Sequence, residues 1–206
     1  MLRSWGRKNS LNVQKVMWAV AELGLEHERI DAGGAFGRLD TPEYGRLNPN
    51  RRVPTVVDGE HVVWESNACV RYLAARYGDG GLWPGDPAAR AGADMRMDWM
   101  ATTVVPDLGV PFWQLVRTPP EERDMPAVAA AVARLGPIWA LLDAHLADRR
   151  FVAADRLTMG DIPVGVAYWR YRSLPIARPS LPNLERWENE LQASAAYRAH
   201  VMLPLT

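Results

Sequence analysis

The stretch Arg51–Ser66 constrains the fold of this chain more than any other part of the sequence. Two short runs of strand-forming residues flank Asp58-Gly59, and an Asp-Gly pair between such runs predicts a tight hairpin turn. Pro54 stands at the opening of the first run, where a proline removes no central ladder hydrogen bond. Glu65 and Ser66 stand where the second strand stops and a helical pattern begins. The stretch therefore predicts strand, turn, strand and helix in immediate succession.

The junction between the second strand and the helix has the chemistry of a site for a zwitterion. A hydroxyl or backbone N–H at a helix start, as at Ser66, suits an anion, and the neighbouring carboxylate of Glu65 suits a cation. One amino-acid group would satisfy both. The alternative is that the two residues form only a helix cap with a stabilising acidic residue in the first turn.

Composition is that of an ordinary globular protein and limits the possible partners. The chain is 48% hydrophobic and 23% charged, and 24 basic residues balance 24 acidic ones. A net charge of zero gives no indication of a nucleic-acid or membrane partner. Cys69 is the only cysteine, so no intrachain disulfide can form, which fits a reducing compartment. The N-terminus lacks an apolar signal core and no run approaches the length of a membrane span, so we expect a cytoplasmic protein.

The residues around the hairpin predict one mixed α and β unit. Apolar residues from Val13 to Leu23 recur at helical spacing, and Gly24 is placed to end that helix. Residues 32–50 are rich in Gly, Pro, Asp and Asn and indicate a loop with a helical turn. The first unit is expected to contain strand 2–5, helix 13–23, strand 28–30, the hairpin, and helix 68–77.

A second, all-helical unit is expected after a run of turn residues. Gly78–Pro87 is rich in Gly and Pro, and strand signals vanish after it. Pro106 and Pro111 are predicted to break or kink the segment that follows the first helix of this unit. We therefore expect a domain at 1–78, a linker at 79–87 and an all-helical domain at 88–206, with helical patterns at 88–105, 126–146, 161–171, 184–191 and 197–202.

Three segments, in order and at matching separations, resemble the cytosolic glutathione transferases. The most specific is Asn48-Pro49 … Val53-Pro54-Thr55 … Asp58-Gly59 … Glu65-Ser66-Asn67-Ala68, which matches the family pattern N-P … V-P-x-L-x-D-G … E-S-x-A-I. Ser10–Val16 with Glu22–Gly24 is similar to the serine-type segment of theta-, delta- and bacterial-like members. Leu157–Ile162, with capping-box spacing between Thr158 and Asp161, is similar to the start of the family's buried central helix. The resemblance covers nearly the whole chain and implies a thioredoxin-like βαβ-ββα domain followed by an all-α bundle.

The resemblance implies an enzyme, a glutathione S-transferase that conjugates the glutathione thiolate to small, largely apolar electrophiles in detoxification. A free thiol has a pKa of about 8.5, so the site must favour the anion. Ser10 aligns with the family's catalytic serine, whose hydroxyl donates to the sulfur. Asn9 and Asn12 are rival donors, and Ser10 could instead only cap the helix.

The same resemblance assigns the glutathione contacts. Pro54 resembles the family's cis-proline, which turns the backbone of Val53 toward the cysteinyl part of glutathione. Glu65 and Ser66 would hold the ammonium and the α-carboxylate of its γ-glutamyl end.

Two further sets of residues are candidates for the rest of the site. Arg51 or Arg52 would meet the glycine carboxylate of glutathione, with Arg51 favoured by position, and either could instead be a solvated surface arginine. Arg7, Arg96 and Arg170 could add charge to the electrophile pocket or simply face solvent. The predicted pocket residues are Trp5, Arg7, Phe112, Trp113 and Tyr168.

Other functions on the same fold stay open at this point. A glutathione-dependent isomerase of the maleylacetoacetate isomerase kind would carry a Ser-Ser-Cys-type segment, which Asn9–Asn12 lacks. A non-catalytic ligand carrier or interaction protein need not bind glutathione. The histidines show no metal-ligand spacing and Cys69 is interpreted as a buried inert thiol, so we expect no metal and no cysteine chemistry. The resemblance also implies a homodimer.

Overall fold

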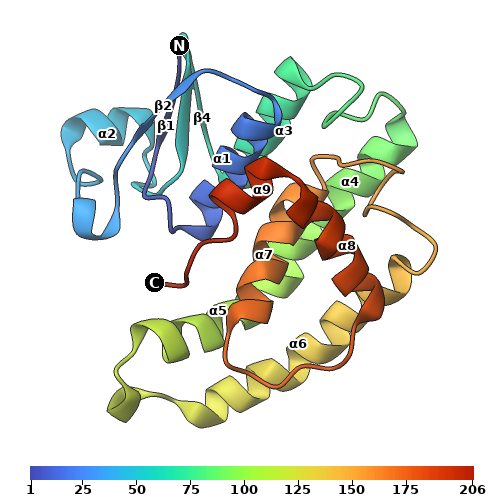
Figure 1. The fold of residues 1–206 in the computed structure, drawn as a ribbon. Coiled ribbons are helices and arrows are strands. Elements are labelled where there is room, and N and C mark those ends of the chain that lie inside the picture. The colour runs from blue at the N-terminus through green and yellow to red at the C-terminus, as the bar shows by residue number, and fades with distance from the viewer.

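Two units follow each other along the chain in the computed structural model, which describes residues 1–206 (Figure 1). The first unit holds a sheet in the strand order β2-β1-β3-β4, with β1 parallel to β2 and antiparallel to β3. This is the predicted βαβ-ββα arrangement. Its elements are β1 (Leu2–Trp5), α1 (Leu11–Glu22), β2 (His27–Ile30), the 3₁₀ turn Gly34–Phe36, α2 (Pro42–Leu47), β3 (Thr55–Asp58), β4 (His61–Trp64) and α3 (Ser66–Tyr77).

The predicted hairpin forms, with its turn one residue later than the Asp58-Gly59 pair. Asp58 pairs with His61, so Gly59 and Glu60 make the connection. Gly59 has φ +60, which glycine adopts without a Cβ clash. In this register Gly59 is the first residue of the turn, and Asp58 is the last residue of β3.

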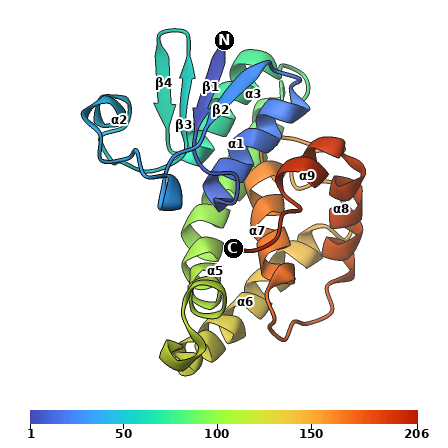
Figure 2. The same ribbon diagram turned by 60° about the vertical axis from the view of Figure 1, so that its left-hand side comes forward.

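Successive side chains of a strand point to opposite faces of the sheet, and each face packs against a separate hydrophobic core. Val56 belongs to the main core with α1 and α3, whereas its neighbour Val57 faces a smaller cluster with Trp5 and Tyr44. Helices α1 and α3 lie beside the sheet on the side of the helical unit, and α2 lies on the opposite side (Figure 2). Residues 13–20 of α1 are all buried because this helix also contacts α7 and α9. Helix α1 therefore joins the two units.

The second unit is all-helical, as predicted. Its elements are α4 (Pro87–Trp99), α5 (Val105–Phe112), α6 (Met125–His145), α7 (Asp161–Ser173), α8 (Pro182–Ala193) and α9 (Ala195–His200). Helix α7 is buried over most of its circumference, which matches its apolar sequence. Residues 79–86, between α3 and α4, contain no helix, and we keep the division into domains 1–78 and 88–206 as a proposal.

The break predicted at Pro106 and Pro111 does not occur. The chain stays helical from α4 to Arg117, with π-helical turns at Met100–Val104 and Trp113–Arg117 on either side of α5. A proline has no N–H to donate, and its ring crowds the carbonyl four residues earlier. A π-helical turn lies directly before Pro106, where the regular hydrogen-bond pattern of the helix changes. Phe112 and Arg117 therefore lie on one continuous helical segment.

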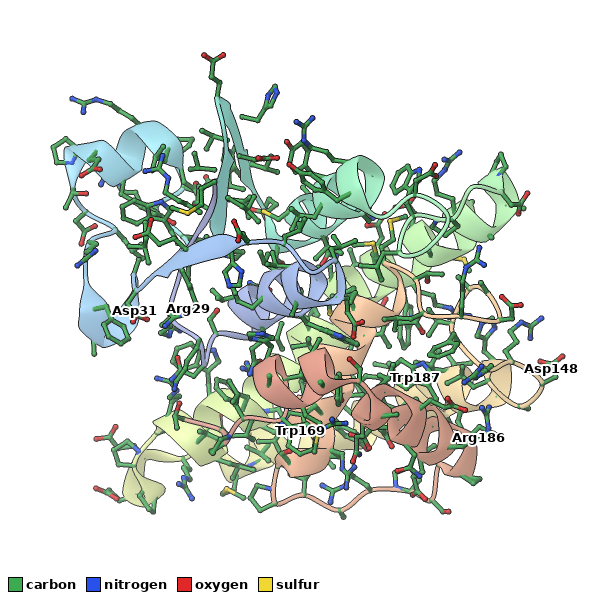
Figure 3. All side chains as sticks on the ribbon, turned by 45° about the horizontal axis from the view of Figure 1, so that its top comes forward. Arg29, Asp31, Asp148, Trp169, Arg186 and Trp187 are labelled. Atoms are coloured by element: carbon green, nitrogen blue, oxygen red, sulfur yellow. The ribbon has the colours of Figure 1, made fainter.

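Only the acidic half of the predicted capping box forms before α7, because the N-cap residue is Gly160 and the Asp161 N–H donates to the Thr158 carbonyl instead of its hydroxyl. The buried Asp161 carboxylate accepts hydrogen bonds from the Thr158 N–H at 2.9 Å and hydroxyl at 3.0 Å. It also accepts from the Val152 N–H and from Nε1 of Trp187 in α8, both at 3.0 Å. Trp187 is labelled in Figure 3. One carboxylate therefore ties the connector before α7 and helix α8 to the central helix.

Helix α6 is, by length and composition, apolar enough to cross a membrane, contrary to the expectation that no such run exists. It packs against α5 and α8 and belongs to the helical bundle. Its buried side chains are Val128, Ala131, Leu135, Trp139 and Leu142.

Candidate active site

The register of the sheet gathers the predicted site at one end. Thr55 pairs with Trp5 on one side and with Trp64 on the other. The residues that follow β1, precede β3 and follow β4 therefore leave the sheet at the same end. These are the loop to Ser10, the Val53-Pro54 peptide and Glu65, and the Val53-Pro54 bond is cis, as the resemblance implied.

A polar network joins the start of α1 to the start of α3. Oδ1 of Asn12 accepts from the Ser66 hydroxyl at 3.1 Å and from Nζ of Lys15 at 3.0 Å. Lys15 also donates to Oγ of Ser66 at 3.2 Å and to Oδ1 of Asn67 at 3.4 Å. Ser66 and Lys15 are both buried, so this network fixes the hydroxyl predicted to hold an anion.

Ser10 is the candidate donor whose side chain is unengaged. It is the N-cap residue of α1, yet its hydroxyl makes no capping hydrogen bond, so the alternative of a pure cap finds no support. The oxygen of Asn12 accepts from Ser66 and Lys15, but its NH₂ group has no hydrogen-bond partner in the chain, so Asn12 stays a rival donor. The amide of Asn9 donates to Thr206 at the end of the chain. The Ser10 hydroxyl is thus free to donate to a ligand.

Glu65 has a backbone conformation that is unusual for a residue with a Cβ. Its φ is +67, in the left-handed region, and it is the N-cap of α3. Its side chain is exposed. Non-glycine residues in this region cost about 1–3 kcal/mol and cluster at ligand sites. The conformation therefore supports a ligand-binding role for this carboxylate.

The side chains of the two arginines before Pro54 differ in their contacts. Nη1 of Arg51 donates to the carbonyl oxygens of Leu39 at 2.8 Å and Thr41 at 3.1 Å, so the guanidinium is held by the loop before α2. The carbonyl of Arg52 accepts from the Tyr44 hydroxyl at 2.6 Å, while its exposed side chain forms no hydrogen bond within the chain. Arg52 is the arginine with a free guanidinium.

A pocket of about 190 Å³ opens beside Ser10, between the loop before α1 and helix α5. It combines residues of both units, as expected for an electrophile site at their junction. Its lining consists of Arg7, Asn9, Ser10, Leu11, Asn12, Val105, Leu108, Gly109, Phe112, Trp113, Arg117 and Arg170.

Arg7, Phe112 and Trp113 line this pocket as predicted, but Trp5 and Tyr168 do not. The Trp5 ring packs edge-on against Tyr44, at 5.6 Å between centroids, in the small core on the other face of the sheet. The Tyr168 ring lies 5.1 Å from that of Trp139 inside the helical bundle. Residues two apart on a helix are rotated by about 200° about its axis, so their side chains lie on nearly opposite faces. From α7, Arg170 therefore faces the pocket and Tyr168 does not.

Arg96 also lies elsewhere. Its guanidinium sits 5.8 Å from the centroid of the Trp99 ring. It does not line the pocket beside Ser10.

Lys15 and Arg117 are site residues that the sequence did not reveal. Burial, aided by the charge of Arg170 and opposed by that of Glu65, lowers the pKa of Lys15 to about 7. In the sequence, Lys15 appears only as a charged residue between apolar positions of a helix. Such residues are common on amphipathic helices, so this pattern does not mark a site. Arg117 carried no signal, because its place depends on the helix continuing past two prolines.

Cys69 is buried, as expected, and its Sγ donates to the Val63 carbonyl. Burial raises the pKa of this thiol to about 12, so it stays protonated and unreactive at neutral pH.

Known proteins show the same organisation. The family model for the N-terminal domain of glutathione S-transferases matches residues 2–75, and that for the C-terminal domain matches residues 125–190. The chain is 40% identical over 208 residues to glutathione S-transferase GstB of Escherichia coli (strain K12), covering 100% of both chains. It is 31% identical to glutathione S-transferase D7 of Drosophila melanogaster, over 80% of this chain and 72% of that one.

A solved structure with a ligand is similar over the whole length. The theta class glutathione S-transferase from Xanthomonas axonopodis pv. citri, with glutathione bound, has a TM-score of 0.96 and 46% identity. The match covers 100% of this chain and 99% of that chain.

Proposed function

The chain belongs to the cytosolic glutathione S-transferase family, and from that membership we propose that it conjugates glutathione to a small electrophile at the pocket beside Ser10. Glutathione is the co-substrate. One observation supports the proposal most strongly. Ser10, with a hydroxyl that has no partner, lies at the same end of the sheet as Val53, Glu65 and Ser66. The pocket beside Ser10 is lined by residues of both units. No observation favours an isomerase or a non-catalytic carrier.

The γ-glutamyl end of glutathione binds at the start of α3. The Glu65 carboxylate takes the ammonium group. The backbone N–H of Ser66 and its hydroxyl, which turns from Asn12 to the ligand, take the α-carboxylate. Lys15, which donates to the Ser66 hydroxyl at 3.2 Å, supplies positive charge behind it. The opposite charges of the zwitterion thus meet the Glu65 carboxylate and the donors at the start of α3.

The rest of glutathione extends along the start of β3. Val53 lies outside the strands, and its backbone N–H and C=O have no hydrogen-bond partner in the chain, so both are available to the cysteinyl residue in the manner of a β-strand. The glycine carboxylate binds Arg51 or Arg52, and the free guanidinium of Arg52 supports the second.

The thiolate forms at Ser10. A hydrogen bond from the Ser10 hydroxyl to the sulfur is charge-assisted and is worth about 1.5–3 kcal/mol. That energy lowers the thiol pKa from about 8.5 to about 6.5–7.5, so a large fraction of the sulfur is ionised near pH 7. The bound sulfur then lies beside the pocket, so attack on the electrophile gains from proximity as well as from ionisation.

The proposal is tested by steady-state conjugation of 1-chloro-2,4-dinitrobenzene with two thiols. Glutathione and cysteinylglycine carry the same cysteine, but the second lacks the γ-glutamyl group. We expect kcat/KM to be at least about 100-fold higher for glutathione, because cysteinylglycine leaves Glu65, Ser66 and Lys15 without a partner. Turnover no faster than the uncatalysed reaction, together with no heat of glutathione binding, would contradict a transferase.

We also propose a homodimer. Large apolar side chains are exposed on the edge strand β4 and on the neighbouring α3 and α4, including Trp64 at 37% exposure, Tyr77 at 40% and Met95 at 56%. An edge strand with exposed apolar residues is a common subunit contact. Light scattering at micromolar concentration is expected to give twice the chain mass of 23.0 kDa, and a monomer would contradict the proposal.

We further infer a cytoplasmic location, which the single, buried Cys69 supports. Cell fractionation tests it, and recovery outside the cytoplasmic fraction would contradict it.

A further inference from the structure

The pocket beside Ser10 is rich in positive charge and has no compensating acid. Arg7, Arg117 and Arg170 line it, and no lining residue is acidic. None of these guanidiniums takes part in an ion pair of the chain. By contrast, other arginines have acceptors, such as Glu188 for Arg172 and the Leu115 and Thr118 carbonyls for Arg123.

Aromatic rings hold two of these arginines and leave their hydrogen-bonding edges free. Cζ of Arg170 lies 4.0 Å from the centroid of the Phe112 ring. Cζ of Arg117 lies 5.7 Å from the same centroid and 5.9 Å from that of Trp113. A ring face attracts the guanidinium without using its N–H donors, so the planar fork stays available for an anion.

The arrangement is unfavourable in the absence of an anion. Nε of Arg170 is buried without a hydrogen-bond partner, and a buried unpaired charge is costly. Burial and the charges of Arg117 and Arg7 lower the pKa of Arg170 to about 10, which still leaves it charged at neutral pH. Glutathione has its own carboxylate sites at Ser66 and at Arg51 or Arg52, so the cluster is left for the second substrate.

We propose that the second substrate is a small anionic electrophile whose carboxylate binds Arg7, Arg117 and Arg170 while its reactive carbon faces the sulfur at Ser10. This inference rests on the proposed function and replaces the expectation of a largely apolar electrophile. The volume of about 190 Å³ favours a small molecule such as a 2-halocarboxylate. A lone pair of the thiolate forms the sulfur–carbon bond, the carbon–halogen bond breaks, and the halide leaves with its electron pair. No proton, oxidant or reductant is needed.

The charge of such a substrate explains why arginines are useful there. A carboxylate next to the reactive carbon repels an approaching thiolate and slows the uncatalysed reaction. Guanidiniums that bind the carboxylate remove this repulsion in addition to orienting the carbon. The enzyme should therefore accelerate the reaction of an anionic electrophile more than that of its neutral counterpart.

The test compares iodoacetate with iodoacetamide, which share the reactive carbon and leaving group and differ in charge. Formation of the two glutathione conjugates is followed by chromatography, and each kcat/KM is divided by the uncatalysed rate constant. We expect the enhancement for iodoacetate to exceed that for iodoacetamide by at least about tenfold. An equal or smaller enhancement for iodoacetate would overturn the inference while the transferase stands. Catalysis of neither reaction, with no turnover of 1-chloro-2,4-dinitrobenzene, would overturn the proposed function itself.

A variant that removes one charge tests whether the three pocket arginines cause the preference for the anionic electrophile. Arg117 is exposed, so Arg117→Gln leaves the fold intact, and it is expected to lower the iodoacetate-to-iodoacetamide ratio by at least about fivefold. Arg156→Gln removes one exposed positive charge outside the pocket and should leave the ratio unchanged. An equal fall in both variants, or a rise in the KM for glutathione that accounts for the whole loss, would overturn the assignment to the second substrate.

Discussion

Nζ of Lys15 in α1 donates to Oγ of Ser66, the first residue of α3, at 3.2 Å. The contact places an ammonium group behind the hydroxyl proposed to bind the α-carboxylate of glutathione. Because burial lowers the pKa of Lys15 to about 7, this group is partly charged at neutral pH in the free protein. An anion bound at Ser66 would favour the charged form, so ligand binding and protonation of Lys15 should support each other.

Replacement of Lys15 should weaken glutathione binding. Lys15→Met keeps the length and apolar stem of the side chain and removes the ammonium, which costs a charge-assisted contribution of about 1.5–3 kcal/mol. We expect the Kd measured by isothermal titration calorimetry at pH 7 to rise by roughly 10- to 100-fold. Lys8→Met is the matched control, because Lys8 is exposed and outside the network. Equal affinities in the wild type and Lys15→Met would show that the ammonium does not act on the ligand.

The same residue should make the stability of the ligand-free protein depend on pH. An unfolded lysine keeps its proton up to about pH 10.4, whereas the folded Lys15 loses it near pH 7. Between these values the unfolded state binds more protons, so the lysine's contribution to the free energy of unfolding rises with pH, by at most about 1.4 kcal/mol per unit. Below pH 7 both states are protonated and the contribution is constant. Urea unfolding of the wild type and Lys15→Met at pH 6, 7, 8 and 9 measures the difference, and a flat difference above pH 7 contradicts the assignment.

The hairpin and the start of α3 were predictable because their signals are local. An Asp-Gly pair between β-rich runs, a proline at a strand opening and an acid followed by a hydroxyl at a helix start each restrict the backbone nearby. Those restrictions placed Glu65 and Ser66 at the end of β4, where the structure has them.

The pocket was less predictable because its residues meet through tertiary packing. Trp5 and Tyr168 are aromatic and near the correct segments, but the sequence does not tell which face of a strand or helix meets a neighbour. Arg117 required a helix that continues through Pro106 and Pro111, against the usual effect of proline. The burial of Lys15 could not be predicted, because it depends on α1 being covered on both sides, by the sheet unit and by α7.

The Asp161 carboxylate should be essential to the stability of the helical unit. Asp161→Asn keeps the shape but turns an NH₂ group toward donors such as the Val152 N–H and Nε1 of Trp187, which then lose their acceptor. Leaving such buried groups unsatisfied costs about 1–3 kcal/mol each, so we expect a loss of at least about 2 kcal/mol in urea unfolding.

Asp124→Asn provides the matched control for that loss. Asp124 caps the exposed start of α6 by accepting from the Ala127 N–H, and asparagine caps a helix about as well as aspartate. Its substitution should change the free energy of unfolding by less than about 0.5 kcal/mol. Equal effects of the two substitutions would show that the buried network is not what holds α7 and α8 together.

We propose that the Ser10 hydroxyl stabilises the thiolate of bound glutathione. The most direct measurement is a pH titration of thiolate ultraviolet absorbance in the glutathione complexes of the wild type, Ser10→Ala, Asn9→Ala and Asn12→Ala. We expect the thiol pKa to rise by about one to two units in Ser10→Ala and to stay within about half a unit in Asn9→Ala. An unchanged titration in Ser10→Ala, with the rise found in Asn9→Ala or Asn12→Ala instead, would contradict it.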